Sequence, residues 1–218
     1  DEGQRVMSHK IIDTSSPNGL NEATKLLHDD GLIAFPADTV WGLACSSTSA
    51  KAIKRLKELK GRSDKHPFPL YAASTEHVWQ VCSGENEVER KLAAEFWPGY
   101  LTMVLPLKNE KLLALASEDG KIGIRVPASP FLRTIVERLG HPLVNTSANP
   151  SGHPPFEELE DLLASMAPNL DAVLVSPEKP KGVASTVIRT NREGFEVLRE
   201  GAISKSQLDG FLNLALKP

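Results

Sequence analysis

A short segment of the chain carries enough positive charge to bind an anion. Between positions 51 and 65, seven lysines and arginines stand against two acids, Glu58 and Asp64, so the formal charge of the segment is +5. A solvated helix face with cations near its C-terminus accounts for most of them. The charge alone therefore leaves two interpretations open, an ordinary surface helix and an anion site.

Lys60 is the cation of this segment that a surface helix does not explain. It follows Leu56 by four residues and Ile53 by seven, so it continues the apolar, inward-facing side of the helix. A lysine charge in that position is half-buried and calls for an anion to meet it. Arg62 follows Gly61 just past the helix end, where its forked guanidinium could bind the same anion.

Two further segments place small polar side chains at the ends of expected strands. Residues 145–149 read Asn-Thr-Ser-Ala-Asn and directly follow a strand at 142–144. Side chains at the carboxyl end of a strand can point into the crevice where open sheets bind ligands. Residues 36–43 also follow a strand and set the Asp38 carboxylate beside the Thr39 hydroxyl. Taken alone, either segment could equally be an ordinary turn.

The absence of several motifs narrows the chemistry. The sequence contains no GxxxxGKS/T phosphate loop, no GxGxxG after a strand, no GxSxG nucleophile elbow and no HExxH pair. Its six histidines are scattered, which gives little support to a zinc site. Cys45 and Cys82 lack CxxC spacing, so we expect two buried free thiols in a reducing compartment. A nucleotide would have to be bound by another route.

Helical and strand-like patterns alternate along the chain, and these elements must position the polar segments. We expect helices around 20–27, 53–59, 88–96, 132–139, 156–166 and 208–215, and strands at 32–35, 69–73, 101–105, 122–126, 142–144, 172–175, 185–188 and 195–198. Such alternation predicts helices packed on a largely internal sheet. Because helices do not separate all the strands, the sheet should be mixed. The expected fold is a mixed α/β domain of the α+β type, with a twisted mixed sheet flanked by helices.

The expected organisation is a single domain with short terminal additions. Residues 1–12 are interpreted as an N-terminal extension, 13–206 as the domain, and 207–218 as a C-terminal helix packed on that domain. One interpretation of the residues before Met7 is a remnant of cloning.

Length and composition fit a soluble globular protein. Hydrophobic residues make up 40% of the 218 and charged residues 24%, which is ordinary, and the length suffices for a core without disulfides or metals. The formal charge of −3 disfavours a nucleic-acid reader that works by bulk electrostatics. No apolar run reaches the roughly 18 residues of a membrane span, and the polar N-terminus does not resemble a signal peptide. We therefore expect a cytoplasmic protein that does not contact a membrane.

Seven segments, taken together and in order, resemble motifs of the YrdC/Sua5 family of threonylcarbamoyl-AMP synthases. They are residues 38–43, 60–62, 97–102, 123–127, 146–152, 185–187 and 199–201. The resemblance extends over nearly the whole chain, from about residue 31 to residue 203. It implies a YrdC-like catalytic domain, in a short form without the additional C-terminal domain of Sua5. The sequence departs from the family pattern at Ala37, Trp41, His66, Pro69, Tyr71, Tyr100 and Asn145.

The resemblance implies an L-threonylcarbamoyladenylate synthase, a nucleotidyltransferase that joins L-threonine, bicarbonate and ATP and releases pyrophosphate. The product would pass to a downstream transferase that modifies tRNA. By position in the motifs, the implied catalytic residues are Lys60, Arg62, Ser147 and Asn149. ATP would also contact His66, Lys121 and Arg199, while threonine would contact Thr39, Tyr71, Arg125, Asn145 and Ser185. Mg²⁺ would be bound through the ATP phosphates, with no protein residue assigned to it.

Two alternatives remain at this stage. A non-catalytic RNA-binding module of the same fold could use the +5 segment, and weak RNA binding is compatible with an enzyme too. The net charge of −3 disfavours the module, as does the presence of Lys60, Arg62, Ser147 and Asn149 together. Carbamoyl-adenylate chemistry, which YrdC-like domains perform in larger hydrogenase-maturation proteins, is disfavoured because the companion domains are missing.

Overall fold

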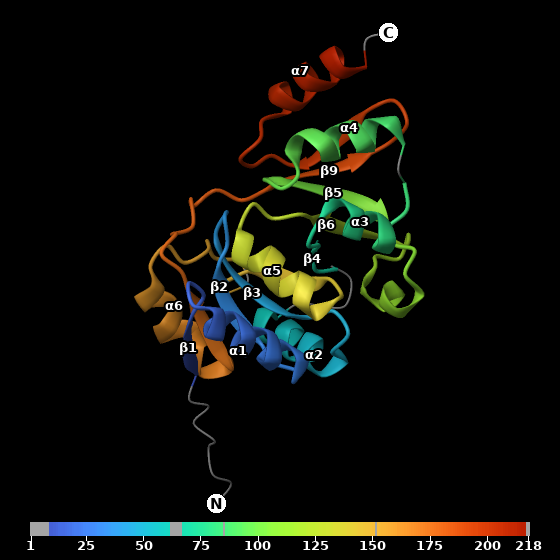
Figure 1. Ribbon diagram of the computed structural model, residues 1–218. Coiled ribbons are helices and arrows are strands. Elements are labelled where there is room, and N and C mark those ends of the chain that lie inside the picture. The colour runs from blue at the N-terminus through green and yellow to red at the C-terminus, as the bar shows by residue number, and fades with distance from the viewer. Residues whose placement is uncertain (1–8, 62–66, 85, 151, 217–218) are drawn as a thin grey trace, which may run out of the picture.

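The computed structural model describes residues 9–61, 67–84, 86–150 and 152–216, and its centre is one mixed sheet of ten strands (Figure 1). The strand order across the sheet is β1-β8-β2-β3-β7-β4-β6-β5-β9-β10. Parallel and antiparallel neighbours both occur, for example β5 parallel to β9 and antiparallel to β6. The strands are β1 (Lys10–Asp13), β2 (Ile33–Pro36), β3 (Trp41–Ser46), β4 (Leu70–Tyr71), β5 (Leu101–Pro106), β6 (Lys121–Arg125), β7 (Leu143–Ser147), β8 (Ala172–Val175), β9 (Thr186–Thr190) and β10 (Phe195–Arg199).

The helices cover the two faces of the sheet unequally. Their bounds are α1 (Pro17–His28), α2 (Ala50–Lys60), α3 (Thr75–Val81), α4 (Glu87–Phe96), α5 (Pro130–Leu139), α6 (Leu159–Met166) and α7 (Lys205–Ala215), with short 3₁₀ turns η1 (Glu110–Leu115) and η2 (Ala167–Asn169). One core lies beneath α1 and α5, which lie side by side in Figure 1. The larger core lies on the other face, beneath the remaining five helices. None of the helices in the described ranges is long and apolar enough to cross a membrane.

Helix α2 illustrates how local chemistry fixes the position of a candidate site residue. The Ser49 hydroxyl accepts a hydrogen bond from the backbone N–H of Ala52 at 3.0 Å, which caps the start of the helix. The helix ends at Gly61, whose φ of 58° lies in the left-handed region that glycine adopts without strain. Ala52, Ile53 and Leu56 point into the core. Because Lys60 continues their side of the helix, its side chain is buried where the helix ends.

The structure confirms the expected mixed α/β fold, and it adds elements that the sequence patterns did not indicate. Residues 41–43, interpreted as part of a turn, begin the fully buried strand β3, which runs to Ser46. Helix α3 and strand β1 were also not expected. The sheet begins at Lys10, because β1 pairs with β8 from that residue onward, three residues before the expected start of the domain. Helix α7 packs on α4, where the rings of Phe96 and Phe211 are 5.4 Å apart.

A histidine outside the candidate site makes stability depend on pH. Nε2 of His141 lies 2.6 Å from Oγ of the buried Ser46. Burial, and then the neighbouring His28 and His77, lower the pKa of His141 below its usual value. As the pH falls through about 6.5, the unfolded chain therefore binds more protons than the native chain, and the native state loses stability.

We predict that the melting temperature falls between about pH 7.5 and about pH 5.5, and falls less in His141→Gln. Thermal unfolding followed by circular dichroism tests this, and an equal fall in both proteins would contradict it.

Candidate functional site

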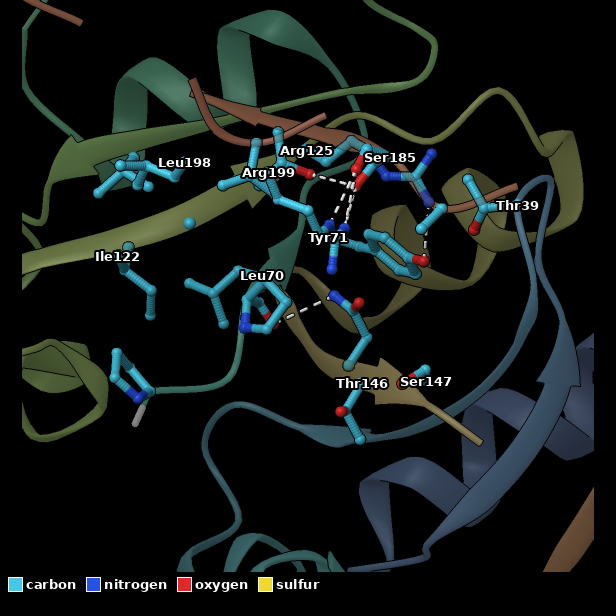
Figure 2. Close-up of a pocket in the computed structure, with 18 of the residues that line it drawn as sticks. Thr39, Leu70, Tyr71, Ile122, Arg125, Thr146, Ser147, Ser185, Leu198 and Arg199 are labelled. Carbon is cyan, nitrogen blue, oxygen red and sulfur yellow. Dashed lines mark hydrogen bonds between the residues drawn. The ribbon is translucent and has the colours of Figure 1, made fainter. Parts of the chain in front are cut away.

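A cavity of about 520 Å³ brings together segments from the whole length of the chain (Figure 2). Its described walls come from β3, β4, β5, β6, β7, β9 and β10 and from the segments that precede β3, β4, β6 and β9. Tyr71 lines the cavity and also belongs to the core beneath α1 and α5. The cavity therefore adjoins that core, on the sheet face where α1 and α5 pack.

The charge of the cavity has one sign. Among the described residues that line it are four cations and no carboxylate. The cations are Lys121, Arg125, Arg189 and Arg199. Hydroxyl and amide side chains stand between them, including those of Ser147 and Asn145. Such a lining suits a ligand with several negative charges, because donors and cations that are already in place need not reorganise when it binds.

Arg125, on β6, is held on three sides. Its Nη1 donates to Asp38 Oδ2 at 2.8 Å and to the Gly99 carbonyl at 3.0 Å, and its Nη2 donates to the Tyr71 hydroxyl at 2.9 Å. The side chain is only 3% exposed. Burial by itself lowers the pKa of Arg125, but Tyr71 and Asp38 outweigh burial and hold the pKa above its ordinary value. Arg125 is therefore a fixed positive charge in the cavity wall.

Arg199, on β10, supplies a second guanidinium near the first. Its Nη2 donates to the Ser185 carbonyl at 2.8 Å and to the Ser185 hydroxyl at 3.2 Å. The same hydroxyl lies 2.9 Å from Oγ1 of Thr102. Burial, and then the charge of Arg125, lower the pKa of Arg199. Because each guanidinium disfavours the charge of the other, an anion bound beside both would stabilise the pair.

Lys60 lies behind the cavity wall and not in it. Its side chain is 2% exposed, and its Nζ donates to the Ser147 carbonyl, the Asn149 carbonyl and Asn149 Oδ1, each at 2.8 Å. The Ser147 hydroxyl donates to the same Asn149 Oδ1 at 2.6 Å. The spacing argument was therefore correct about the burial of Lys60. The partners in the described structure are oxygens of the turn after β7.

The predicted site residues divide into three groups. Eight of the twelve line the cavity: Thr39, Tyr71, Lys121, Arg125, Asn145, Ser147, Ser185 and Arg199. Lys60 and Asn149 are not among its described lining, but they contact each other and the Ser147 turn. Arg62 and His66 lie outside the described residues. In Figure 2, Thr39, Tyr71, Arg125 and Ser185 gather at one end of the cavity, while Ile122 and Leu198 lie toward the other.

Three residues that shape the site, Arg189, Thr102 and Asp38, were not among the predicted site residues. Arg189 lies on the same strand face as Ser185 and Val187, so strand alternation from Ser185 could have found it. Thr102 lies within the segment at 97–102 that resembles a family motif, but no role was assigned to it. Asp38 binds Arg125 across 87 residues of sequence, and no local pattern signals such a pairing.

The described residues contain no group of three or more histidines, cysteines or acids that could hold a metal ion. Cys45 and Cys82 are buried and free, as expected, and burial raises the pKa of each to about 12. Neither thiol is thus available as a thiolate ligand near neutral pH.

Comparisons with known proteins agree with the motif pattern. Residues 25–201 match the Sua5_yciO_yrdC family profile, described as telomere recombination. A threonylcarbamoyl-AMP synthase of Bacillus subtilis is 28% identical over 202 residues, which are 92% of this chain and 58% of the relative. One of Marinobacter nauticus is 32% identical over 75% of this chain and 88% of the relative.

Solved structures show the same architecture. P. abyssi Sua5 complexed with L-threonine superposes with a TM-score of 0.81 at 26% identity, over 93% of this chain and 60% of that one. E. coli YciO superposes with a TM-score of 0.81 over 92% and 98% of the two chains; at 23% identity it supports the fold alone. This chain thus spans about three-fifths of the Bacillus and Pyrococcus relatives. Since the family profile matches most of its length, the chain belongs to the Sua5/YciO/YrdC family.

Proposed function

We propose that the chain catalyses the formation of threonylcarbamoyl-AMP and pyrophosphate from L-threonine, bicarbonate and ATP. The observation that carries the proposal is one cavity lined by four cations and, among its described residues, by no carboxylate. All three substrates bear negative charge, so a site that joins them must hold like charges close together. The name threonylcarbamoyl-AMP synthase on several relatives supports this choice of substrates.

The end of the cavity around Arg125 is suited to the amino acid. Arg125 provides a fixed charge for the threonine carboxylate, and the buried hydroxyls of Thr39 and Ser185 stand nearby. Tyr71 and Asn145 complete this end. The Pyrococcus Sua5 structure with L-threonine supports an amino-acid subsite in a fold of this kind.

The other polar groups are suited to the triphosphate. Ser147, Lys121 and Arg199 line the same cavity and can donate to phosphate oxygens. Lys60 and Asn149 would act through the turn that presents Ser147. Arg62 and His66 follow α2 directly in sequence, and we retain both as ATP contacts in the proposal. Mg²⁺ bound through the phosphates would reduce the negative charge of the triphosphate.

The reaction needs positioning more than a strong base. The threonine amine attacks the carbon of bicarbonate-derived carbon dioxide and loses a proton, which gives a carbamate. A carbamate oxygen then attacks the α-phosphorus of ATP, the new P–O bond forms, and the bond from the α-phosphorus to the bridging oxygen breaks to release pyrophosphate. Negative charge accumulates on the phosphoryl oxygens in this step, so cations held in place lower the barrier. The product would serve a transferase that modifies tRNA.

The substrate requirement is the direct test. We predict that the protein releases pyrophosphate from ATP only when L-threonine and bicarbonate are both present. Coupled detection of pyrophosphate, with each substrate omitted in turn, measures this. RNA binding with a steep salt dependence and no such turnover would contradict the proposal and favour the RNA-binding module.

The Lys60 ammonium should matter through the turn that it holds. We predict that Lys60→Ala lowers the rate of pyrophosphate release at least about tenfold, because a lost charged hydrogen bond typically costs about 1.5–3 kcal/mol. Lys54→Ala is the matched control, since Lys54 lies on the same helix with a 79% exposed side chain and, among the described residues, pairs with Glu58 at 4.0 Å. Circular dichroism establishes that both variants are folded. Turnover of Lys60→Ala within twofold of the control would contradict the assignment.

A further inference from the structure

We infer that Asp38 is a positioning residue of the amino-acid subsite, which fixes the direction in which the Arg125 guanidinium faces the cavity. The inference rests on the proposed function and deepens it. Asp38 is not among the described residues that line the cavity, whereas Arg125 is. Its effect on a ligand would therefore pass through Arg125.

One oxygen of Asp38 makes all of its hydrogen bonds. Oδ2 accepts from Arg125 Nη1 at 2.8 Å and from the backbone N–H of Ala128 at 2.9 Å. The second bond matters because Ala128 precedes α5 by two residues and is part of the scaffold. Asp38 thus links the guanidinium to a fixed point of the backbone. The bonds from Arg125 to Gly99 and Tyr71 complete a three-point attachment.

The attachment leaves donors for a ligand. A guanidinium has five N–H groups, and three of those of Arg125 donate to the acceptors just named. The remaining two, on Nε and Nη2, can donate to a carboxylate in the cavity. Without Asp38 the buried guanidinium would lose its counter-charge and one of its fixed points, and its orientation would change.

The other oxygen of Asp38 allows the position of this side chain to be tested separately from its charge. Oδ1 is buried and accepts no hydrogen bond from the described residues. An asparagine can therefore place its amide nitrogen at Oδ1 without losing a bond, while its carbonyl oxygen keeps both bonds of Oδ2. Asp38→Asn retains the position and removes the charge. Asp38→Glu retains the charge and moves the carboxylate by one methylene.

A second carboxylate in the chain provides a matched control. Asp171 Oδ2 accepts from Arg55 Nη1 at 2.8 Å and from the backbone N–H of Leu32 at 2.7 Å, which is the same pattern of bonds. Neither Asp171 nor Arg55 is among the described lining of the cavity. Asp171→Ala therefore removes an equivalent link away from the site.

The experiment measures KM for L-threonine and for ATP in the wild type and in Asp38→Ala, Asp38→Asn, Asp38→Glu and Asp171→Ala. We expect Asp38→Ala and Asp38→Glu to raise the KM for threonine at least about tenfold, with the KM for ATP within about threefold of wild type. Asp38→Asn should restore the KM for threonine to within about threefold, and Asp171→Ala should leave it unchanged even where its melting temperature falls. If Asp38→Ala does not fold, the contrast between the asparagine and glutamate variants still shows whether the position of the Asp38 side chain controls the KM for threonine.

Three outcomes would overturn the inference: an unchanged KM in Asp38→Ala or Asp38→Glu, equal changes in Asp38→Asn and Asp38→Ala, or an equal change in Asp171→Ala. If the wild type shows no threonine-dependent turnover, the proposed function fails. Crystal structures of Asp38→Asn and Asp38→Ala then test separately whether Asp38 positions the Arg125 guanidinium. The inference then requires that Arg125 leaves Gly99 and Tyr71 in the alanine variant only. A guanidinium that stays in place in both variants would overturn it.

Discussion

The repulsion between the buried guanidinium of Arg125 and the more exposed guanidinium of Arg199 is the constraint on which the architecture of the site depends. Arg125 and Arg199 stand close enough that the first disfavours the charge of the second, and burial adds to the effect. Within the described structure one carboxylate, that of Asp38, contacts this pair, and it contacts only Arg125. Positive charge is thus in excess beside the cavity. A protein can maintain such an excess at modest cost if anionic ligands neutralise it during function.

The fold meets this constraint by fixing each cation with hydrogen bonds from other parts of the chain. Arg125 is fixed by groups from the turn before β3, the turn before β5 and strand β4. Arg199 is fixed by Ser185, which precedes β9. The turn that carries Ser147 is held from behind by Lys60 at the end of α2. Groups far apart in sequence therefore hold these side chains in position, and a site whose donors are already positioned binds its ligand at a lower cost.

The sequence predicted the fold class, and eight of the twelve predicted site residues line the cavity; the exceptions have physical causes. Strand β3 is buried on both faces and shows no alternation, so its first three residues, 41–43, were interpreted as part of a turn. Lys60 was correctly predicted to face inward, because helical spacing fixes direction. Spacing does not identify a partner 87 residues away, so the bonds from Lys60 to the carbonyl oxygens of Ser147 and Asn149 were not predicted. The Asp38–Arg125 pair was missed for the same reason, since tertiary packing alone brings it together.

The account predicts where the substrates bind, and crystals soaked with ATP and L-threonine test that most directly. We expect the threonine carboxylate beside Arg125 and the phosphates beside Ser147 and Arg199, both within the one cavity. Well-ordered ATP or threonine bound outside this cavity, with Arg125 and Arg199 still facing each other without a ligand, would contradict the account.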